Sequence, residues 1–273
     1  WLHTKLETFM TTYNLKGKTA LVTGASSGIG LGVAQSLAEE GVNLFLISRD
    51  EERLKESVEN LRSSSDSRIE FLAGDVNDIS LAKKSKDLVD SLFGECNILI
   101  NNSGGPPMGN FLDFSVKEWE SAYKQNLFSI INFTKNFYPD MQKKNWGRII
   151  NISSTLAKEP TPQMVLSATM RAGVSAFSKA VSSEMAPFGV TINTICPGGV
   201  LTQRMKNLVE TSAKNQKKDF EEVLKESVNS IPLGRFATTE EFSKIVLFLV
   251  SEHAGYITGV SLMADGGLTK GIF

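Results

Sequence analysis

Two short segments carry residue types whose spacing suits chemistry. The first, residues 23–30, places Gly24, Gly28 and Gly30 between an apolar run and a helical pattern. Glycines allow a sharp turn and a close approach of the backbone to a pyrophosphate, and the free N–H groups at the start of the following helix favour an anion. This context predicts a phosphate-binding turn, with an ordinary glycine-rich turn as the alternative.

The second segment, residues 163–181, has the pattern of a helix and places Ser167 and Arg171 four residues apart. Positions i and i+4 share one face of a helix, so both side chains can reach the same bound ligand. What they do there depends on the elements that hold them.

Short apolar runs alternate with amphipathic helical patterns, which predicts an α/β fold: a Rossmann-like, doubly wound parallel sheet of about seven strands with helices on both faces. The predicted strands are 19–23, 43–47, 69–73, 98–101, 148–152, 191–195 and 259–264. The predicted helices are 29–40, 51–61, 81–92, 117–143, 164–186 and 239–250. Segment 202–232 is also expected to be helical, either as a lid or as a solvated pair of helices.

Length and composition fit one domain. We expect residues 14–273 to form a single dinucleotide-binding domain after an N-terminal extension, residues 1–13. The formal net charge of −1 argues against nucleic acid or an anionic membrane as partner. No apolar run reaches the roughly 18 residues of a membrane span, and the first residues lack the apolar region of a signal peptide. Cys96 and Cys196 are interpreted as free buried thiols, which fits a reducing cytoplasm.

Further motifs accompany the glycine turn. They are GDV at 74–76, NNSG at 101–104, NLFS from Asn126, GRIINISS at 147–154, PGGVLT at 197–202 and the long C-terminal stretch 231–267. Together with the Gly-x-x-x-Gly-x-Gly spacing and Thr23, they resemble the short-chain dehydrogenase/reductase family, in particular its 3-oxoacyl-acyl-carrier-protein reductase-like members. The resemblance covers nearly the whole chain from Asn14.

The resemblance implies roles for individual residues. Asn126 would hold a proton-relay water, and Ser154 would polarise the substrate carbonyl. The implied catalytic positions are Ser154, Asn126, Ser167 and Arg171. The implied cofactor-binding positions are Thr23, Gly24, Ser26, Ser27, Gly28, Ile29, Gly30, Ser48, Arg49, Asp75, Val76, Asn102, Ser103, Gly104, Arg171, Pro197, Gly198, Val200 and Thr202.

The catalytic positions depart from the family pattern. There a tyrosine donates the proton and a lysine four residues later lowers its pKa; this chain has Ser167 and Arg171, in a register that the following Ala-Gly fixes. The four tyrosines, Tyr13, Tyr123, Tyr138 and Tyr256, all lie elsewhere. A serine hydroxyl is a weaker acid than a phenol, and arginine keeps its charge but exchanges no proton. A positioned general acid contributes about 10²–10⁴-fold to a rate.

The cofactor preference depends on the end of the second strand. An acidic residue about 20 positions past the glycines would bind the ribose 2′-hydroxyl of NAD. Ser48 stands there, and Arg49 follows. A guanidinium binds a 2′-phosphate bidentately, so the sequence favours NADP(H), with NAD(H) as the alternative. Arg49 could instead be a solvated charge beside Asp50 and Glu51.

Three functions stay open. The first is an NADP(H)-dependent oxidoreductase that reduces a small-molecule carbonyl or oxidises an alcohol and takes its proton from elsewhere: from Ser154, from Ser167 through water, from a water chain at Asn126, or from the substrate. The second is an NADP(H)-binding protein with little or no redox activity. The third is a lyase or dehydratase that uses the same pocket.

Several residues also have two interpretations. Ser154 is catalytic or a turn residue, Ser167 an active hydroxyl or a space-filler, and Arg171 a cofactor anchor or an ion-pair partner. Loop 104–111 lines the substrate site or is a plain turn.

Three further expectations concern partners. Phe220, Val223 and Leu224 face an apolar substrate or pack on the sheet. His3 and His253 have no partners at metal-ligand spacing, so no metal site is expected. The family resemblance implies a homotetramer or homodimer.

Overall fold

The computed structural model describes residues 13–272, so the predicted extension lies outside the described residues except for Tyr13, and so does His3. Seven parallel strands form one sheet in the order β3-β2-β1-β4-β5-β6-β7. They are β1 (Thr19–Thr23), β2 (Asn43–Ser48), β3 (Ile69–Ala73), β4 (Ile98–Asn101), β5 (Gly147–Ile152), β6 (Val190–Pro197) and β7 (Ser261–Ala264). The strand order reverses between β1 and β4.

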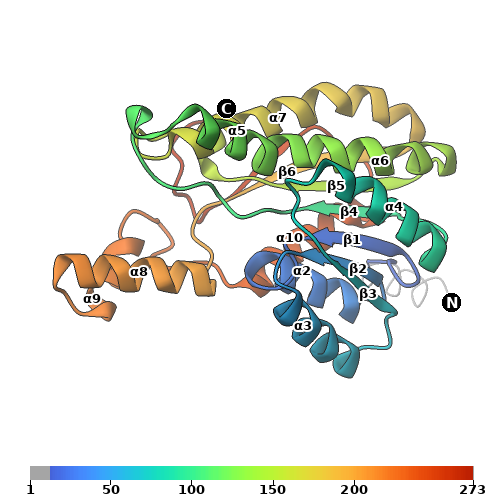
Figure 1. Cartoon of the computed structure of the whole chain (residues 1–273), viewed down its shortest axis with the longest axis horizontal. Helices are drawn as coiled ribbons and strands as arrows, with labels where there is room; N and C mark the ends of the chain where they lie inside the picture. The colour runs from blue at the N-terminus through green and yellow to red at the C-terminus, as the bar shows by residue number, and fades with distance from the viewer. Residues whose placement is uncertain (1–12, 273) are drawn as a thin grey trace, which may run out of the picture.

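Helices cover both faces of the sheet, which confirms the doubly wound prediction (Figure 1). One face carries α2 (Gly28–Glu39), α3 (Glu51–Ser64) and α10 (Thr239–Val250). The other carries α4 (Ile79–Phe93), α6 (Ser129–Lys144) and α7 (Val165–Met185). No helix in residues 13–272 combines the length and the apolar character that crossing a bilayer requires.

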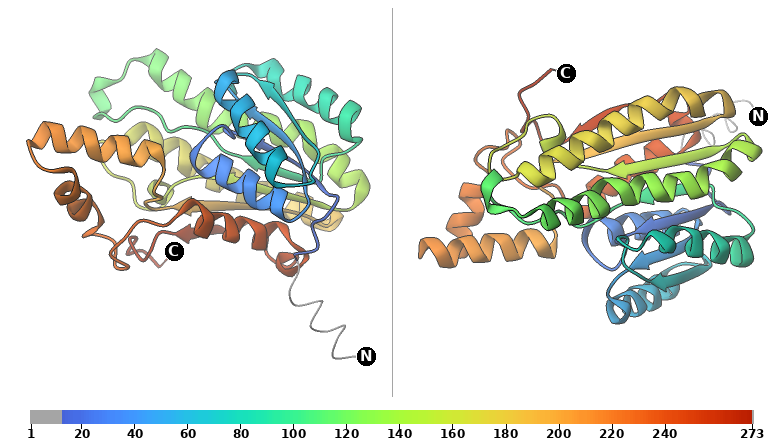
Figure 2. Two further views of the ribbon diagram at one scale, coloured as in Figure 1. Left: turned by 90° about the horizontal axis from the view of Figure 1, so that it is seen from below. Right: turned by 45° about the horizontal axis from the view of Figure 1, so that its top comes forward.

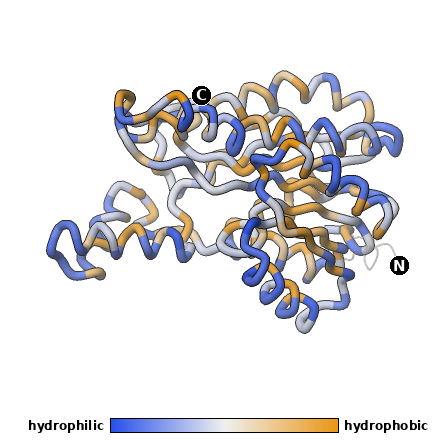
Figure 3. The backbone as a smooth tube through the Cα atoms, viewed as in Figure 1, coloured by the Kyte–Doolittle hydropathy of each residue, from blue (hydrophilic) through white to orange (hydrophobic). Residues whose placement is uncertain are grey.

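The strands separate two hydrophobic cores. Successive side chains of a strand point to opposite faces of the sheet. In β1, Ala20 and Val22 join the core under α2, α3 and α10, and Leu21 joins the core under α4, α6 and α7. Figure 3 shows the resulting pattern, with apolar strands in the middle and polar outer faces on the helices. Burial on both faces explains why the strands appear in the sequence as continuous apolar runs.

The helix predicted over residues 117–143 is present over residues 116–144, but it is not a regular α-helix throughout. It consists of α5 (Val116–Tyr123), a π-helical turn (Lys124–Phe128) and α6. A π turn inside a longer helix is usually a single widened turn, frequently at a functional site. Its widened hydrogen-bond spacing depends on packing against the rest of the molecule, so hydrophobic periodicity alone did not reveal it.

Segment 202–232 forms α8 (Gln203–Gln216) and α9 (Phe220–Val228), which extend away from the sheet (Figures 1 and 2). Phe220 and Leu224 pack on a small cluster made by Val209, Ala213 and Val223. The segment is thus helical, as predicted, and has the form of the expected helix pair. Its three apolar side chains line neither cavity of the protein and belong to neither core of the sheet. They join α8 to α9, because two amphipathic helices can bury their apolar faces against each other.

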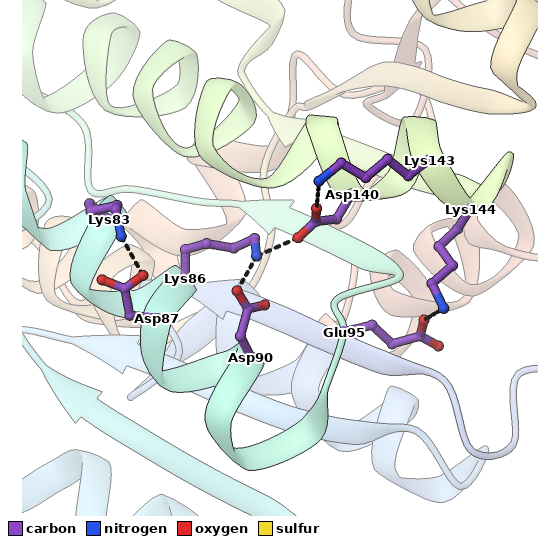
Figure 4. A network of polar contacts seen from close by, with 8 residues as sticks. All are labelled: Lys83, Lys86, Asp87, Asp90, Glu95, Asp140, Lys143 and Lys144. Carbon is purple, nitrogen blue, oxygen red and sulfur yellow. Dashed lines mark hydrogen bonds and ion pairs between the residues drawn. The ribbon is translucent and has the colours of Figure 1, made fainter.

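A polar network at the surface joins α4 to α6 (Figure 4). Lys86 bonds both Asp90 on its own helix and Asp140 on α6. Burial lowers the pKa of Lys86, but the hydrogen bonds that it donates to Asp140 and Asp90 outweigh this effect, so its pKa is raised. The pKa of Asp140 is lowered, chiefly by the hydrogen bond from Lys86.

Buried polar side chains attach α7 to the sheet. Asn101 on β4 donates to Asn151 on β5 (2.8 Å), and Asn151 donates to Ser178 on α7 (2.9 Å). Thr194 on β6 donates to the same serine oxygen at 2.9 Å. Ser178 lies seven residues beyond Arg171, two helical turns along the same face, so this network holds the Arg171 face of α7 against the ends of three strands.

Candidate active site

A cleft of about 490 Å³ lies at the carboxyl ends of the strands, over the point where the strand order reverses. Open α/β sheets bind ligands at this position. The cleft is lined by Gly24, Ser26, Ser27, Gly28, Ile29, Ser48, Arg49, Asp50, Arg53, Gly74, Val76, Asn102, Ser103, Gly104, Gly105, Gln125, Ile152, Ser153, Arg171, Pro197, Thr202, Gln203 and Arg204. It therefore joins the glycine turn to the Arg171 face of α7.

The glycine turn is shaped for a close approach. A Cβ at Gly30 would lie 2.2 Å from the Gly24 carbonyl oxygen, so no other residue fits without displacing the turn. Gly28 has a φ of +57°, a conformation that favours glycine. Ser27, the N-cap of α2, makes no side-chain cap hydrogen bond. The N–H groups of the first turn of α2 thus lack a side-chain cap at the wall of the cleft, which fits a phosphate group.

Two residues fasten this turn to β4. Thr23 Oγ1 donates to the Asn102 carbonyl and accepts from the Asn102 N–H, both at 2.8 Å. The Asn102 side chain also donates to the Gly24 carbonyl at 3.3 Å. Thr23 thus shapes the turn from behind, since its side chain is buried and does not line the cleft.

At the β2 end of the cleft, the Ser26 and Ser48 hydroxyls are 2.7 Å apart. Arg49 is exposed and makes no ion pair with any described carboxylate. Its acidic neighbours are already engaged, since Asp50 pairs with Arg53 at 3.3 Å and Glu51 with Lys55 at 2.8 Å. Arg49 is therefore an exposed, unpaired charge at the edge of the cleft, a position that agrees both with a cofactor contact and with the alternative of a solvated charge beside these acids.

At the opposite end, Arg171 is buried, with only 5% of its surface exposed. Its Nη1 donates to the Ile152 carbonyl at 2.6 Å, and its Nη2 donates to the Ser103 carbonyl at 3.3 Å. Its Nε is buried without a partner, and no carboxylate among residues 13–272 lies within 4.0 Å of its nitrogens. Burial lowers the pKa of the guanidinium to about 10. The structural ion-pair interpretation is thus wrong: the positive charge faces the cleft unpaired.

The serines lie around this arginine. Ser154 Oγ accepts from the Leu156 N–H at 3.2 Å and caps the short 3-10 turn Thr155–Ala157, which leaves its own hydrogen available to another acceptor. Ser167 is buried, and its hydroxyl makes no hydrogen bond within residues 13–272. Neither serine lines the cleft as it stands, whereas Ser153 does. The geometry is compatible with both interpretations of each serine.

Asn126 lies in the π turn and is completely buried. Its side-chain nitrogen donates to Ser103 Oγ at 3.0 Å and to the Gly104 carbonyl at 2.7 Å. Its Oδ1 is buried without a partner. Asn126 therefore holds the 103–104 segment in place from below and keeps one acceptor unused, an arrangement that suits an ordered water.

The structure brings most of the predicted site residues together. Thr23, Gly30, Asp75, Gly198, Val200 and Asn126 support the cleft without lining it, as do Ser154 and Ser167. Asp75 accepts from the Asn77 N–H at 3.0 Å and shapes its loop, while Val76 faces the cleft. Val200 forms a bridge with Ala237, and Thr202 caps α8 by accepting from the Met205 N–H at 3.2 Å.

Arg204 is the main residue that the sequence argument missed. It is the second residue of α8, two positions after the PGGVLT motif, and its guanidinium lies over Gly104 and Gly105. Its position just after the motif could have marked it as a candidate, but the sequence did not predict the direction of α8.

Loop 104–111 continues from the cleft to a second cavity of about 590 Å³, which is lined in part by Asn110, Phe111 and Thr169. Loop 104–111 thus borders both cavities, and it is anchored where the Gly109 N–H donates to the Gln163 carbonyl.

The remaining predictions concern the two cysteines and possible metal ligands. Cys96 and Cys196 are free and buried, as predicted. Burial raises the pKa of the Cys96 thiol to about 12 and that of the Cys196 thiol above its usual range. Within residues 13–272, no three His, Cys, Asp or Glu side chains are grouped as metal ligands would be.

Comparisons with known proteins agree with this geometry. The family model described as enoyl-(acyl carrier protein) reductase matches residues 24–269. D-beta-hydroxybutyrate dehydrogenase of Cupriavidus necator is 34% identical over 255 residues, which cover 93% of this chain and 98% of the relative. The 3-oxoacyl-(acyl-carrier-protein) reductase FabG of Chlamydia muridarum is 35% identical over 256 residues, with 93% and 98% covered.

Solved structures of reductases also resemble this chain. L-sorbose reductase from Gluconobacter frateurii, in complex with NADPH and L-sorbose, superposes with a TM-score of 0.93 at 28% identity, covering 96% of this chain and 100% of that one. YwfH, an NADPH-dependent reductase involved in bacilysin biosynthesis, gives a TM-score of 0.88 at 32% identity, with 93% and 99% covered. With its glycine turn, its sheet and a family model that spans both ends of the cleft, the chain belongs to the short-chain dehydrogenase/reductase family.

Proposed function

We propose that the protein is an NADP(H)-dependent oxidoreductase that reduces a carbonyl group, or oxidises the corresponding alcohol, without a tyrosine proton donor. The observation that carries this proposal is the continuity of the cleft, which runs from the uncapped start of α2 to the unpaired Arg171. Named relatives are dehydrogenases and reductases, and two structural neighbours were solved with NADPH.

The residues present fit a dinucleotide. A Cβ at Gly24 would lie 2.7 Å from the Asn102 side-chain nitrogen, and a Cβ at Gly30 would lie 2.2 Å from the Gly24 carbonyl oxygen, so the tight turn requires glycine at both positions. A glycine turn of this kind lets the backbone approach a pyrophosphate closely. Arg49 is the charged group that supports NADP(H) over NAD(H). It stands after Ser48, is free of carboxylate partners and lines the cleft. A guanidinium in this state can bind a 2′-phosphate through two parallel hydrogen bonds.

The chain's own groups would act on the substrate as follows. When bound, the nicotinamide supplies or accepts the hydride. Ser154 can donate its hydroxyl hydrogen to the substrate oxygen, because that hydrogen is not used in capping the 3-10 turn. Arg171 places positive charge where an alkoxide develops, and oriented charge of this kind stabilises such a transition state. The proton itself would come from water, held by the unused Oδ1 of Asn126 or by Ser167.

Measurement of NADPH oxidation with neutral ketones, oxo esters and oxo acids tests the proposal. We expect turnover with at least one carbonyl class, and tighter binding of NADPH than of NADH by about tenfold or more, since a hydrogen bond to a charged group contributes about 1.5–3 kcal/mol. Tight NADPH binding without turnover on any compound would contradict the redox proposal.

That outcome would favour the second candidate, an NADP(H)-binding protein with little redox activity. The specific observation for it is Ser167, a buried residue whose hydroxyl is short and weakly acidic and occupies the position of the family's proton donor. Product formation without a change in nicotinamide absorbance would instead point to a lyase or dehydratase.

Assembly and location remain predictions. We expect a homotetramer or homodimer in a reducing cytoplasm. Multi-angle light scattering of the purified protein tests the assembly, and a stable monomer at micromolar concentration would contradict it.

A further inference from the structure

Two arginines converge on one short segment of the cleft. Arg171 Nη2 donates to the Ser103 carbonyl at 3.3 Å. The Arg204 guanidinium nitrogens lie 3.4 and 3.6 Å from the positions that a Cβ would occupy on Gly105 and Gly104. The two cations therefore approach three consecutive residues from opposite elements, α7 and the start of α8.

Neither cation has an acidic partner in the part of the chain that the structure describes. Arg171 uses two of its five donors on backbone carbonyls, and its buried Nε has no acceptor. Arg204 is exposed to solvent, and its side chain makes no hydrogen bond or ion pair with residues 13–272. The single carboxylate that lines the cleft, Asp50, lies at the opposite end and pairs with Arg53. The buried, unpaired charge of Arg171 is costly, and an anionic ligand would relieve that cost, while the exposed Arg204 is free to contact the same ligand.

The position of this pair argues against the cofactor pyrophosphate as the anion. The pyrophosphate has its own donors at the glycine turn after β1. Arg171 contacts the ends of β4 and β5 instead, and Arg204 lies over Gly104 and Gly105 rather than over Gly28. A dinucleotide that begins at Arg49 and crosses the turn would place its nicotinamide, and the substrate beside it, at these strands.

We propose that Arg171 and Arg204 form a binding site for the carboxylate of the substrate, so that the protein prefers oxo acids and hydroxy acids to neutral ketones. This inference rests on the proposed function, because it places a substrate beside the nicotinamide. Two guanidiniums can each bind a carboxylate through paired hydrogen bonds, which fixes the orientation of the adjacent carbonyl. Arg171 would then hold substrate at a position where relatives of the family use a proton-exchanging side chain.

Binding to the NADP⁺-loaded protein tests this directly, because a carbonyl compound cannot be reduced by the oxidised cofactor. Isothermal titration would compare 2-oxobutyrate, acetoacetate and 4-oxopentanoate, each with its methyl ester. We expect at least one acid to bind about tenfold or more tightly than its ester, in line with a charge-assisted hydrogen bond. If no acid binds more tightly than its ester, the proposal is wrong.

Substitutions then assign the preference to the arginines. Arg204→Gln should bring the acid-to-ester ratio of that pair close to one and change NADP⁺ affinity by less than about twofold; Arg171→Met should lower the ratio as well. Lys206→Gln is the matched control, since Lys206 is an exposed cation on the same helix and does not line the cleft. An unchanged ratio in Arg204→Gln overturns the proposal. So does a tenfold loss of NADP⁺ affinity with the ratio retained, because the pair would then serve the cofactor phosphates.

These results are independent of turnover. A protein that prefers acids but never oxidises NADPH would support the carboxylate site and contradict the proposed oxidoreductase activity. A protein that reduces neutral ketones and binds acids no more tightly than esters would support the proposed oxidoreductase activity and contradict the carboxylate site.

Discussion

The two ends of the cleft differ in how their polar groups are satisfied. At the glycine turn, Thr23 and Asn102 bond to each other and fix the shape of the backbone, and the first N–H groups of α2 are left without a side-chain cap. At the α7 end, the Arg171 Nε and the Asn126 Oδ1 are buried without partners, and the Ser167 hydroxyl makes no hydrogen bond within the described residues. The glycine turn thus offers a ligand its backbone N–H groups, whereas the α7 end offers unused side-chain donors and acceptors. Binding geometry and proton chemistry are thus separable within one fold.

The largest effect should come from restoring a phenol and an amine at the α7 end. Ser167→Tyr with Arg171→Lys should raise kcat/KM for neutral ketones by about 10²–10⁴-fold, the usual contribution of a positioned general acid. Stopped-flow NADPH oxidation would measure it. Ser183→Tyr, at an exposed position of the same helix, should have no effect. No gain in a folded double variant would mean that the α7 end lacks more than a proton donor.

The next largest effect concerns the glycine turn. Gly30→Ala places a Cβ against the Gly24 carbonyl oxygen and should weaken NADPH binding by about tenfold to a hundredfold, because overpacking costs about 1–3 kcal/mol. Fluorescence titration checks this. Gly94→Ala is the control: it has a φ of +80° and open space around it, so it should lower the free energy of unfolding by about 1–2 kcal/mol and leave binding unchanged. Parental NADPH affinity in Gly30→Ala would show that the turn yields easily.

A smaller effect should separate the binding of NADPH from that of NADH at the β2 end of the cleft. Arg49→Gln should weaken NADPH binding by about tenfold and leave NADH binding unchanged, because it removes the guanidinium that contacts the 2′-phosphate and NADH has no such phosphate. Competition between the two nucleotides measures the ratio. Lys55→Gln removes an equal charge on α3, where Lys55 pairs with Glu51, and should change neither affinity. Equal losses for both nucleotides in Arg49→Gln would contradict a specific phosphate contact.

The smallest effect should come from the surface network that joins α4 to α6, whose residues do not line the cleft. Asp140→Asn removes the α4–α6 bond to Lys86 and should lower the free energy of unfolding by about 1 kcal/mol or less. The pKa of Asp140 is lowered on folding, so this contribution is present above its ordinary value of 3.8 and is lost as the pH falls below it. Urea unfolding should show a larger difference between variant and parent at pH 7 than at pH 3. An equal difference at both values would exclude the ion pair as its cause.

Most of the fold could be predicted because strands buried on both faces leave continuous apolar runs. The bounds of β1, β3, β4 and α10 agree with the prediction, and the others differ by a few residues. The glycine turn was also predictable, since its demands are local. Arg204 was not, because its place over Gly104 depends on the direction of α8. The sequence identified Arg171 as an anomaly, but only the packing shows that its charge has no partner.

The π turn at Lys124–Phe128 has one more consequence. It accommodates one residue more than a regular turn would, and each residue of an α-helix advances the side-chain direction by about 100°. Removing a single residue there would rotate α5 relative to α6 and turn Asn126 away from Ser103 and Gly104. The chemistry beneath the cleft therefore depends on a count of residues as well as on their identities, and insertions or deletions in this helix should be far less tolerated than substitutions on its exposed face.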